Sequence, residues 1–118
     1  MLKHSSQCVG YRLEIENKII AVCIDTTECE AIKTLAKNAD VLITEASYQE
    51  RQEKGGYPHL KPEAAAKAAK ETSVKTLILT HFDQVRFPTL ASRQEIVPII
   101  EKIYGPAIIA TDGLEYLF

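Results

Sequence analysis

The sequence predicts an α/β fold, in which helices cover one or both faces of a β-sheet. Short apolar runs alternate along the 118 residues with longer segments of helical spacing, in the order strand-strand-helix-strand-helix-strand-helix-strand-strand. The first two strands and the last two follow each other closely enough to form antiparallel hairpins, whereas helices separate the strands between them. No linker, repeat or low-complexity tract divides the chain, so one domain is expected.

The first two predicted strands form the hairpin. Residues 9–16 alternate apolar and polar side chains, which is typical of a half-buried strand. Asn17-Lys18 is predicted to turn the chain back into the apolar run Ile19–Ile24, and Asp25 closes that run.

A helix and a buried strand are predicted next. Thr27-Glu-Cys-Glu30 fits a capping box, and an apolar helix face follows, made by Ile32, Leu35, Ala36 and Ala39. Val41–Thr44 is short and apolar, as expected of a buried strand. The polar residues 50–56, which end in Gly55-Gly56, predict a mobile loop.

The second half of the chain repeats the alternation. Pro62 suits the first position of a helix, and the alanine-rich segment Glu63–Glu71 has high helix propensity. Val74–Thr80 is predicted to be the next strand, and residues 82–90 a loop.

The last helix and the last two strands complete the prediction. Ser92-Arg-Gln-Glu95 fits a second capping box, and Pro98 is expected to kink or delay the helix that follows. The apolar face of this helix consists of Ile96, Ile99, Ile100 and Ile103. Asp112-Gly113 is a hairpin-turn pair that would join the strands Ala107–Thr111 and Leu114–Phe118.

Composition excludes several classes of protein. The net charge of −2 gives no electrostatic reason for nonspecific binding to nucleic acid, although a local basic patch remains compatible with it. Three cysteines without CxxC spacing argue against a disulfide framework and indicate a reducing compartment, the cytoplasm. We expect no membrane span, because no segment approaches about 20 apolar residues.

The three histidines and one aspartate lie at or near the ends of predicted strands and helices. His4 precedes the first strand, His81 follows the run Thr76–Thr80, His59 precedes the helix at Pro62, and Asp25 ends a strand. Side chains at strand ends project into a common crevice, and imidazoles with a carboxylate are typical ligands of a polynuclear metal site. Taken singly, each residue has an ordinary structural explanation, so the hypothesis depends on the whole set.

Segments from one end of the chain to the other resemble, in order, motifs of the metallo-β-lactamase-fold phosphodiesterases, most closely the ribonuclease Z group. The segments are Leu2–Glu14, Ile24–Thr26, Leu42–Ala46, His59–Ala65, Leu79–Phe82 and Ala110–Glu115. The His-x-His-x-Asp-His motif that defines this family lies upstream of all of them and has no counterpart here. The resemblance therefore implies that residues 1–118 form the C-terminal half of a metallo-β-lactamase αββα sandwich, a mixed β-sheet with helices on one face.

The resemblance also implies a set of site residues. Asp25 would bridge two divalent ions, zinc or alternatively manganese, with His4 and His81 as one ligand each. His59 would protonate the leaving oxygen or stabilise phosphate charge, and Glu45 would orient His59 or a ligand histidine.

Two functions follow as alternatives. The first is metal-dependent hydrolysis of a phosphodiester, with RNA as the expected substrate, once the missing half completes the site. Two ligands per ion are fewer than the three of catalytic zinc sites, so the isolated chain should bind metal weakly and hydrolyse little. The second is a non-catalytic half-domain that serves dimerisation or RNA or protein binding, with vestigial ligands. In both, half of a sandwich exposes an apolar sheet face, and we expect a homo-oligomer or a complementing chain to cover it.

Overall fold

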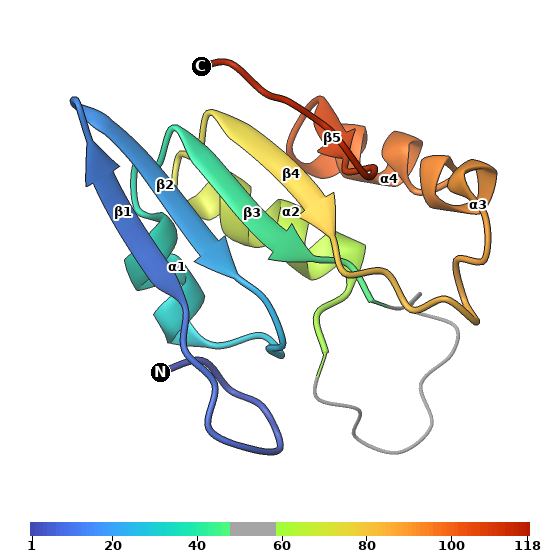
Figure 1. Ribbon diagram of the computed structural model, residues 1–118, viewed down its shortest axis with the longest axis horizontal. Helices are drawn as coiled ribbons and strands as arrows, with labels where there is room; N and C mark the ends of the chain where they lie inside the picture. Colours follow the sequence, from blue (N-terminus) through green and yellow to red (C-terminus); the bar gives the residue numbers. More distant parts are fainter. Residues whose placement is uncertain (48–58) are drawn as a thin grey trace.

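The computed structural model describes residues 1–47 and 59–118, and these residues form one five-stranded sheet (Figure 1). The strands are β1 (Tyr11–Ile15), β2 (Lys18–Cys23), β3 (Val41–Glu45), β4 (Thr76–Thr80) and β5 (Ala107–Ile109), in that spatial order. β1 is antiparallel to β2, and all the other pairs are parallel. The carboxyl ends of β2, β3 and β4 therefore meet at one edge of the sheet.

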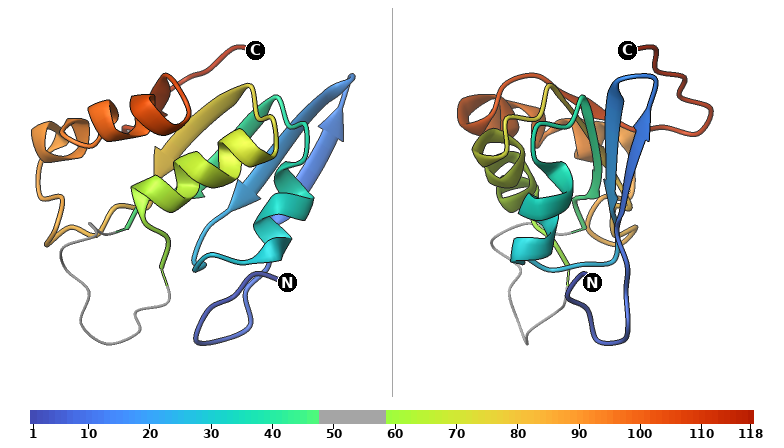
Figure 2. Two further views of the ribbon diagram at one scale, coloured as in Figure 1. Left: turned by 180° about the vertical axis from the view of Figure 1, so that it is seen from behind. Right: turned by 90° about the vertical axis from the view of Figure 1, so that its left-hand side faces the viewer.

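Helices cover one face of the sheet, as the sequence predicts (Figure 2). They are α1 (Glu30–Ala36), α2 (Pro62–Glu71) and α4 (Val97–Ile103), and the short α3 (Leu90–Gln94) precedes α4. Pro62 occupies the start of α2, and the alanines of this helix bury its inner face. Alanine is small, so α2 lies close to the buried sheet residues Leu42, Leu77 and Leu79. The mixed sheet with helices on one face confirms the predicted fold class.

The predicted helix starts need two corrections. The structure has no side-chain cap from Thr27 among the described residues: α1 begins at Glu30, after Cys29. The backbone N–H of Thr27 instead donates to the carbonyl of Lys3, 2.8 Å away, and so ties the N-terminal segment to this turn. The second capping box lies three residues earlier than predicted, between Thr89 and Ser92.

Pro98 explains why the last predicted helix is divided in two. Proline has no N–H to donate within a helix, so the helical residues divide into α3 and α4, with Pro98 in the first turn of α4. The predicted delay of this helix is confirmed.

The turn of the first hairpin lies one residue earlier than predicted. Glu16 and Asn17 form this turn with positive φ (49° and 65°), and β2 begins at Lys18.

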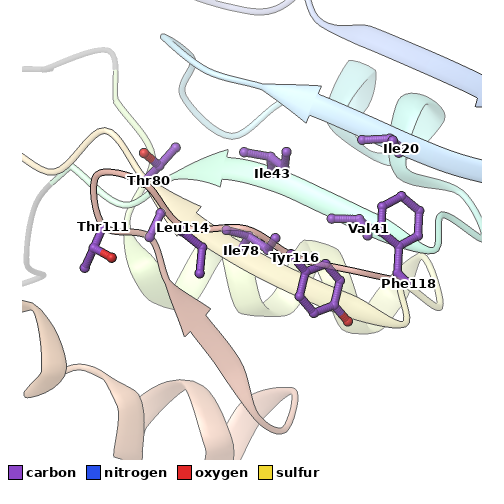
Figure 3. Close-up of a pocket in the computed structure, with 11 residues that line it drawn as sticks. Ile20, Val41, Ile43, Ile78, Thr80, Thr111, Leu114, Tyr116 and Phe118 are labelled. Atoms are coloured by element: carbon purple, nitrogen blue, oxygen red, sulfur yellow. The ribbon is translucent and has the colours of Figure 1, made fainter.

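The C-terminal segment does not form the predicted strand. β5 ends at Ile109, the chain turns at Asp112-Gly113, and residues 114–118 cross the sheet face opposite the helices (Figures 2 and 3). Leu114, Tyr116 and Phe118 lie over the sheet, where a groove of about 330 Å³ separates this tail from Ile20, Ile43 and Ile78 among others. These three apolar side chains face the sheet but stay 37–46% exposed, and the predicted pairing with residues 107–111 is absent from the described structure.

Part of that second face has no cover within residues 1–47 and 59–118. Tyr11, Leu13 and Ile15 of β1 are 57%, 43% and 55% exposed, and cross-strand pairing puts them on the same face as Ile20 and Val22. No helix in these described ranges is both long and apolar enough to cross a membrane. The predicted mobile loop at residues 50–56 lies outside the described residues.

Candidate metal site

Three of the candidate residues lie where parallel strands end. Glu45 is the last residue of β3, His81 follows β4 directly, and Asp25 comes two residues after β2. Asp25 (φ 55°) and His81 (φ 50°) adopt left-handed backbone conformations, which are unfavourable for residues other than glycine. Such strain persists only when surrounding contacts enforce it, and it concentrates at functional sites. The fold therefore fixes these two side chains at the carboxyl edge of the sheet.

The side chains of four candidate residues converge at this edge. One ligand atom each from Asp25, Glu45, His59 and His81 lies within 4.8 Å of the others. Asp25 Oδ1 and His81 Nε2 are 3.2 Å apart, and both side chains are about half exposed. In a tetrahedral zinc site, bonds of about 2.0–2.1 Å separate neighbouring ligand atoms by about 3.3 Å. The Asp25–His81 pair therefore has the spacing of two ligands on one divalent ion.

Glu45 is fully buried and is held by several hydrogen bonds. Its Oε1 accepts from the backbone N–H of Thr26, and its Oε2 accepts from the hydroxyl of Ser47. Nδ1 of His59 lies 2.8 Å from the same Oε2. A carboxylate without water is stable only when hydrogen-bond donors surround it in this way. Because Glu45 accepts a hydrogen bond from Nδ1, it orients the His59 ring so that Nε2 points away from Glu45.

His59 lies between the other two histidine rings. Its ring centroid is 5.1 Å from that of His4 and 5.7 Å from that of His81. His4 lies outside the group of four ligand atoms, so its role as a metal ligand stays a prediction. However, His4 Nε2 is buried and has no hydrogen-bond partner among residues 1–47 and 59–118, which is uncommon for a buried polar atom. A ligand atom is one use for such a nitrogen.

Ser47 also belongs to this cluster, although no sequence motif points to it. Its buried hydroxyl lies 2.5 Å from Glu45 Oε2, 3.3 Å from His81 Nδ1 and 2.8 Å from the carbonyl oxygen of His81. Ser47 also lines a pocket of about 220 Å³, together with His59, His81, Phe82 and Asp83. The available signal was its position two residues after Glu45, since alternate residues of an extended chain point to the same side.

The thiol nearest to this site in sequence belongs to the core. Cys23 is buried under the helices, and this burial, together with the neighbouring Cys29 and Cys8, raises the pKa of its thiol to about 12. It is therefore a neutral thiol at neutral pH, as expected for a small core residue.

A mixed sheet with helices on one face and a cluster of histidine and acidic side chains at its carboxyl edge defines a partial metallo-β-lactamase fold. A family model described as the β-lactamase superfamily domain matches residues 2–82, more than half of the sequence. The chain belongs to the metallo-β-lactamase superfamily.

Its relatives of similar sequence are ribonucleases. Ribonuclease Z of Bacillus licheniformis is 46% identical over 103 residues, which cover 86% of this chain and 33% of that protein. Ribonuclease Z of Exiguobacterium sp. is 33% identical over 104 residues, covering 86% of this chain and 34% of the relative. This chain thus spans about a third of the length of the curated relatives it matches.

Solved structures agree on the fold. The metallo-β-lactamase fold protein YhfI from Bacillus subtilis matches with a TM-score of 0.79 and 23% identity, over 96% of this chain and 44% of that one. The short form of human tRNase Z matches with a TM-score of 0.55 and 25% identity, over 82% of this chain and 32% of that one.

Proposed function

We propose that this chain contributes the C-terminal half of the catalytic domain of a metal-dependent phosphodiesterase that cleaves RNA. The observation that carries the proposal is the 3.2 Å separation of Asp25 Oδ1 and His81 Nε2 within the cluster of four ligand atoms. The ribonuclease Z relatives support RNA as the substrate class. Only 33% of the Bacillus licheniformis relative and 44% of YhfI are matched, so the proposed enzyme would include polypeptide beyond the matched part.

The residues at the carboxyl edge would have two roles, metal binding and proton transfer. Asp25 and His81 would hold a divalent ion, zinc or alternatively manganese. His4, whose buried Nε2 has no partner among the described residues, would be a ligand of a second ion together with Asp25. When bound, such ions lower the pKa of a coordinated water and offset the charge of the phosphate. His59, oriented by Glu45, would carry the proton for the leaving oxygen on Nε2.

Metal content tests this proposal directly. The chain is stripped with a chelator, reloaded with zinc or manganese, and measured by mass spectrometry alongside Asp25→Ala and His81→Ala. We expect metal in the wild type and its loss in both variants, because each variant removes one of the two paired ligands. Asp112→Ala, which removes an exposed carboxylate from the turn after β5, is the matched control and should retain metal.

Two outcomes would contradict the proposal. Wild type that holds no metal would favour the alternative of a non-catalytic half-domain with vestigial ligands. Metal retained by both Asp25→Ala and His81→Ala would show that ions bind elsewhere on the chain.

We further propose that a polypeptide covers the open sheet face, either a second copy of the chain or a complementing chain. Exposed Tyr11, Leu13 and Ile15 support this, because soluble proteins rarely expose a contiguous apolar patch of this kind. The three free cysteines also favour a reducing compartment such as the cytoplasm.

A further inference from the structure

The hydroxyl of Ser47 lies between Glu45 and His81. On one side it lies 2.5 Å from Oε2 of Glu45, and on the other 3.3 Å from Nδ1 of His81. Ser47 is buried, so water does not compete freely for these contacts. The neighbour to which this hydroxyl donates its proton therefore decides whether its oxygen can accept a hydrogen bond from the ring of His81.

The hydroxyl has one proton, and Glu45 is its strongest acceptor. Glu45 also accepts from the Thr26 N–H and from His59, an arrangement that suits an ionised carboxylate, which can only accept hydrogen bonds. A charge-assisted hydrogen bond is stronger than one to a carbonyl, so the Glu45 carboxylate competes better for this proton than the carbonyl of His81, 2.8 Å from Ser47 Oγ. With its proton on the Glu45 side, Ser47 Oγ can only accept from Nδ1 of His81.

We propose that Ser47 is a positioning residue that keeps the proton of His81 on Nδ1. The other ring nitrogen, Nε2, then presents its lone pair toward Asp25 Oδ1, 3.2 Å away, where a divalent cation could bind both atoms. Ser47 thus sets His81 in the tautomer that a metal ligand needs. The link to metal rests on the proposed function, whereas the tautomer itself does not.

Asp25 is the competing influence, because its carboxylate can accept a proton from Nε2. Its side chain is 50% exposed, so water and salt screen its charge. Glu45 has no exposure and lies 3.9 Å from Nδ1 of His81, where its field is screened much less. Burial therefore decides in favour of a proton on Nδ1.

Nitrogen NMR of the metal-free chain tests this tautomer. Long-range proton–nitrogen spectra of ¹⁵N-labelled protein at about pH 8, above the ordinary histidine pKa of about 6.5, report which ring nitrogen of His81 is protonated. We expect the Nδ1–H form in the wild type and a shift toward Nε2–H in Ser47→Ala, with Ser47→Thr restoring the wild-type form. Ser5→Ala, which removes a hydroxyl 3.1 Å from His4 Nδ1, is the control and should leave His81 unchanged.

Zinc titration against a chromogenic chelator gives the second readout. Loss of a hydrogen bond that orients a ligand histidine typically weakens metal binding 10- to 100-fold, and we expect a loss of about that size in Ser47→Ala but not in Ser47→Thr. Nε2–H in the neutral wild type would overturn the proposal, even if Ser47→Ala fails to fold. Equal zinc affinity of the wild type and Ser47→Ala would overturn its link to metal. Wild type with Nδ1–H but no zinc binding would refute the proposed function and leave the tautomer assignment standing.

Discussion

Glu45 shows how much of this site depends on a single buried charge. Its carboxylate receives hydrogen bonds from Thr26, Ser47 and His59, which come from three separate stretches of the chain. It therefore stabilises the fold and orients the site at the same time.

Glu45→Gln should be strongly destabilising. The amide group of glutamine would replace one acceptor oxygen with a donor, facing donors that are already in place. Since hydrogen bonds to charged groups contribute about 1.5–3 kcal/mol each, we expect the free energy of unfolding to fall by about 2–4 kcal/mol. Urea denaturation measures this change, and the exposed Glu101→Gln on α4 is the control, expected to stay within about 0.5 kcal/mol of wild type. Equal stability of both variants would show that the Glu45 bonds contribute nothing net.

The sequence predicts site residues where the chemistry of the side chain is distinctive. It predicts Asp25, Glu45, His59 and His81, and the structure brings these four side chains together, while their roles stay predictions. No sequence motif points to Ser47, because serine is common in loops and only its distances to Glu45 and His81 distinguish it.

At the scale of elements, the position of a helix cap decides which threonine matters for stability. Thr89→Ala should lower the free energy of unfolding by about 1 kcal/mol, because Thr89 caps the N–H of Ser92 at the start of α3. Thr27→Ala is the matched control and should change it little, since the backbone and not the side chain of Thr27 makes the contact to Lys3. Thermal unfolding of both variants distinguishes the two positions, and a larger effect at Thr27 would restore the capping box that the sequence predicted.

Asp40 joins the starts of β2 and β4 and makes stability depend on pH. Lys75 Nζ, 2.7 Å away, and the N–H of Ile19, 2.8 Å away, hold the pKa of the Asp40 carboxyl below its usual value. A lowered pKa means that its contribution is present above the unfolded pKa of about 3.9 and is lost as pH falls through the folded value.

Asp40→Asn should therefore lower Tm at neutral pH, and the difference from wild type should shrink as the pH falls below about 4. Calorimetry across that range measures it, with the exposed Asp112→Asn as a control that should show no such trend. A Tm difference that is constant with pH would exclude ionisation of Asp40 as its source.

At the scale of the whole molecule, the two sheet faces differ in how they are covered. Helices bury one face, whereas the tail at residues 114–118 covers only part of the other, through contacts such as that between the Tyr116 and Thr76 hydroxyls, 2.9 Å apart. The exposed side chains of β1 leave the remaining part open, which supports the proposed cover by a second polypeptide.

Leu13→Lys should weaken that association. A charge in the middle of an apolar contact loses its hydration when the surface is covered, so self-association or binding of a complementing chain should decrease without loss of the fold. Sedimentation velocity over a range of protein concentrations, with circular dichroism for the fold, measures both. Val85→Lys is the control, since Val85 is 84% exposed in the loop after β4, away from this face. A wild-type chain that is monomeric at every concentration and binds no hydrophobic dye would contradict the proposed cover.

The sequence by itself determined the alternation of strands and helices, the helix-covered mixed sheet, and the candidate residues at strand ends. These features depend on near neighbours: period-2 alternation in residues 11–15, alanines along α2, and Pro62 and Pro98 at helix starts. Tertiary structure decided the rest. It buried Glu45, brought Asp25 Oδ1 within 3.2 Å of His81 Nε2, and laid residues 114–118 across the sheet face instead of pairing them as a strand. The physical reason is that local patterns fix how each residue faces its own element, whereas distances between elements arise from packing among residues far apart in the chain.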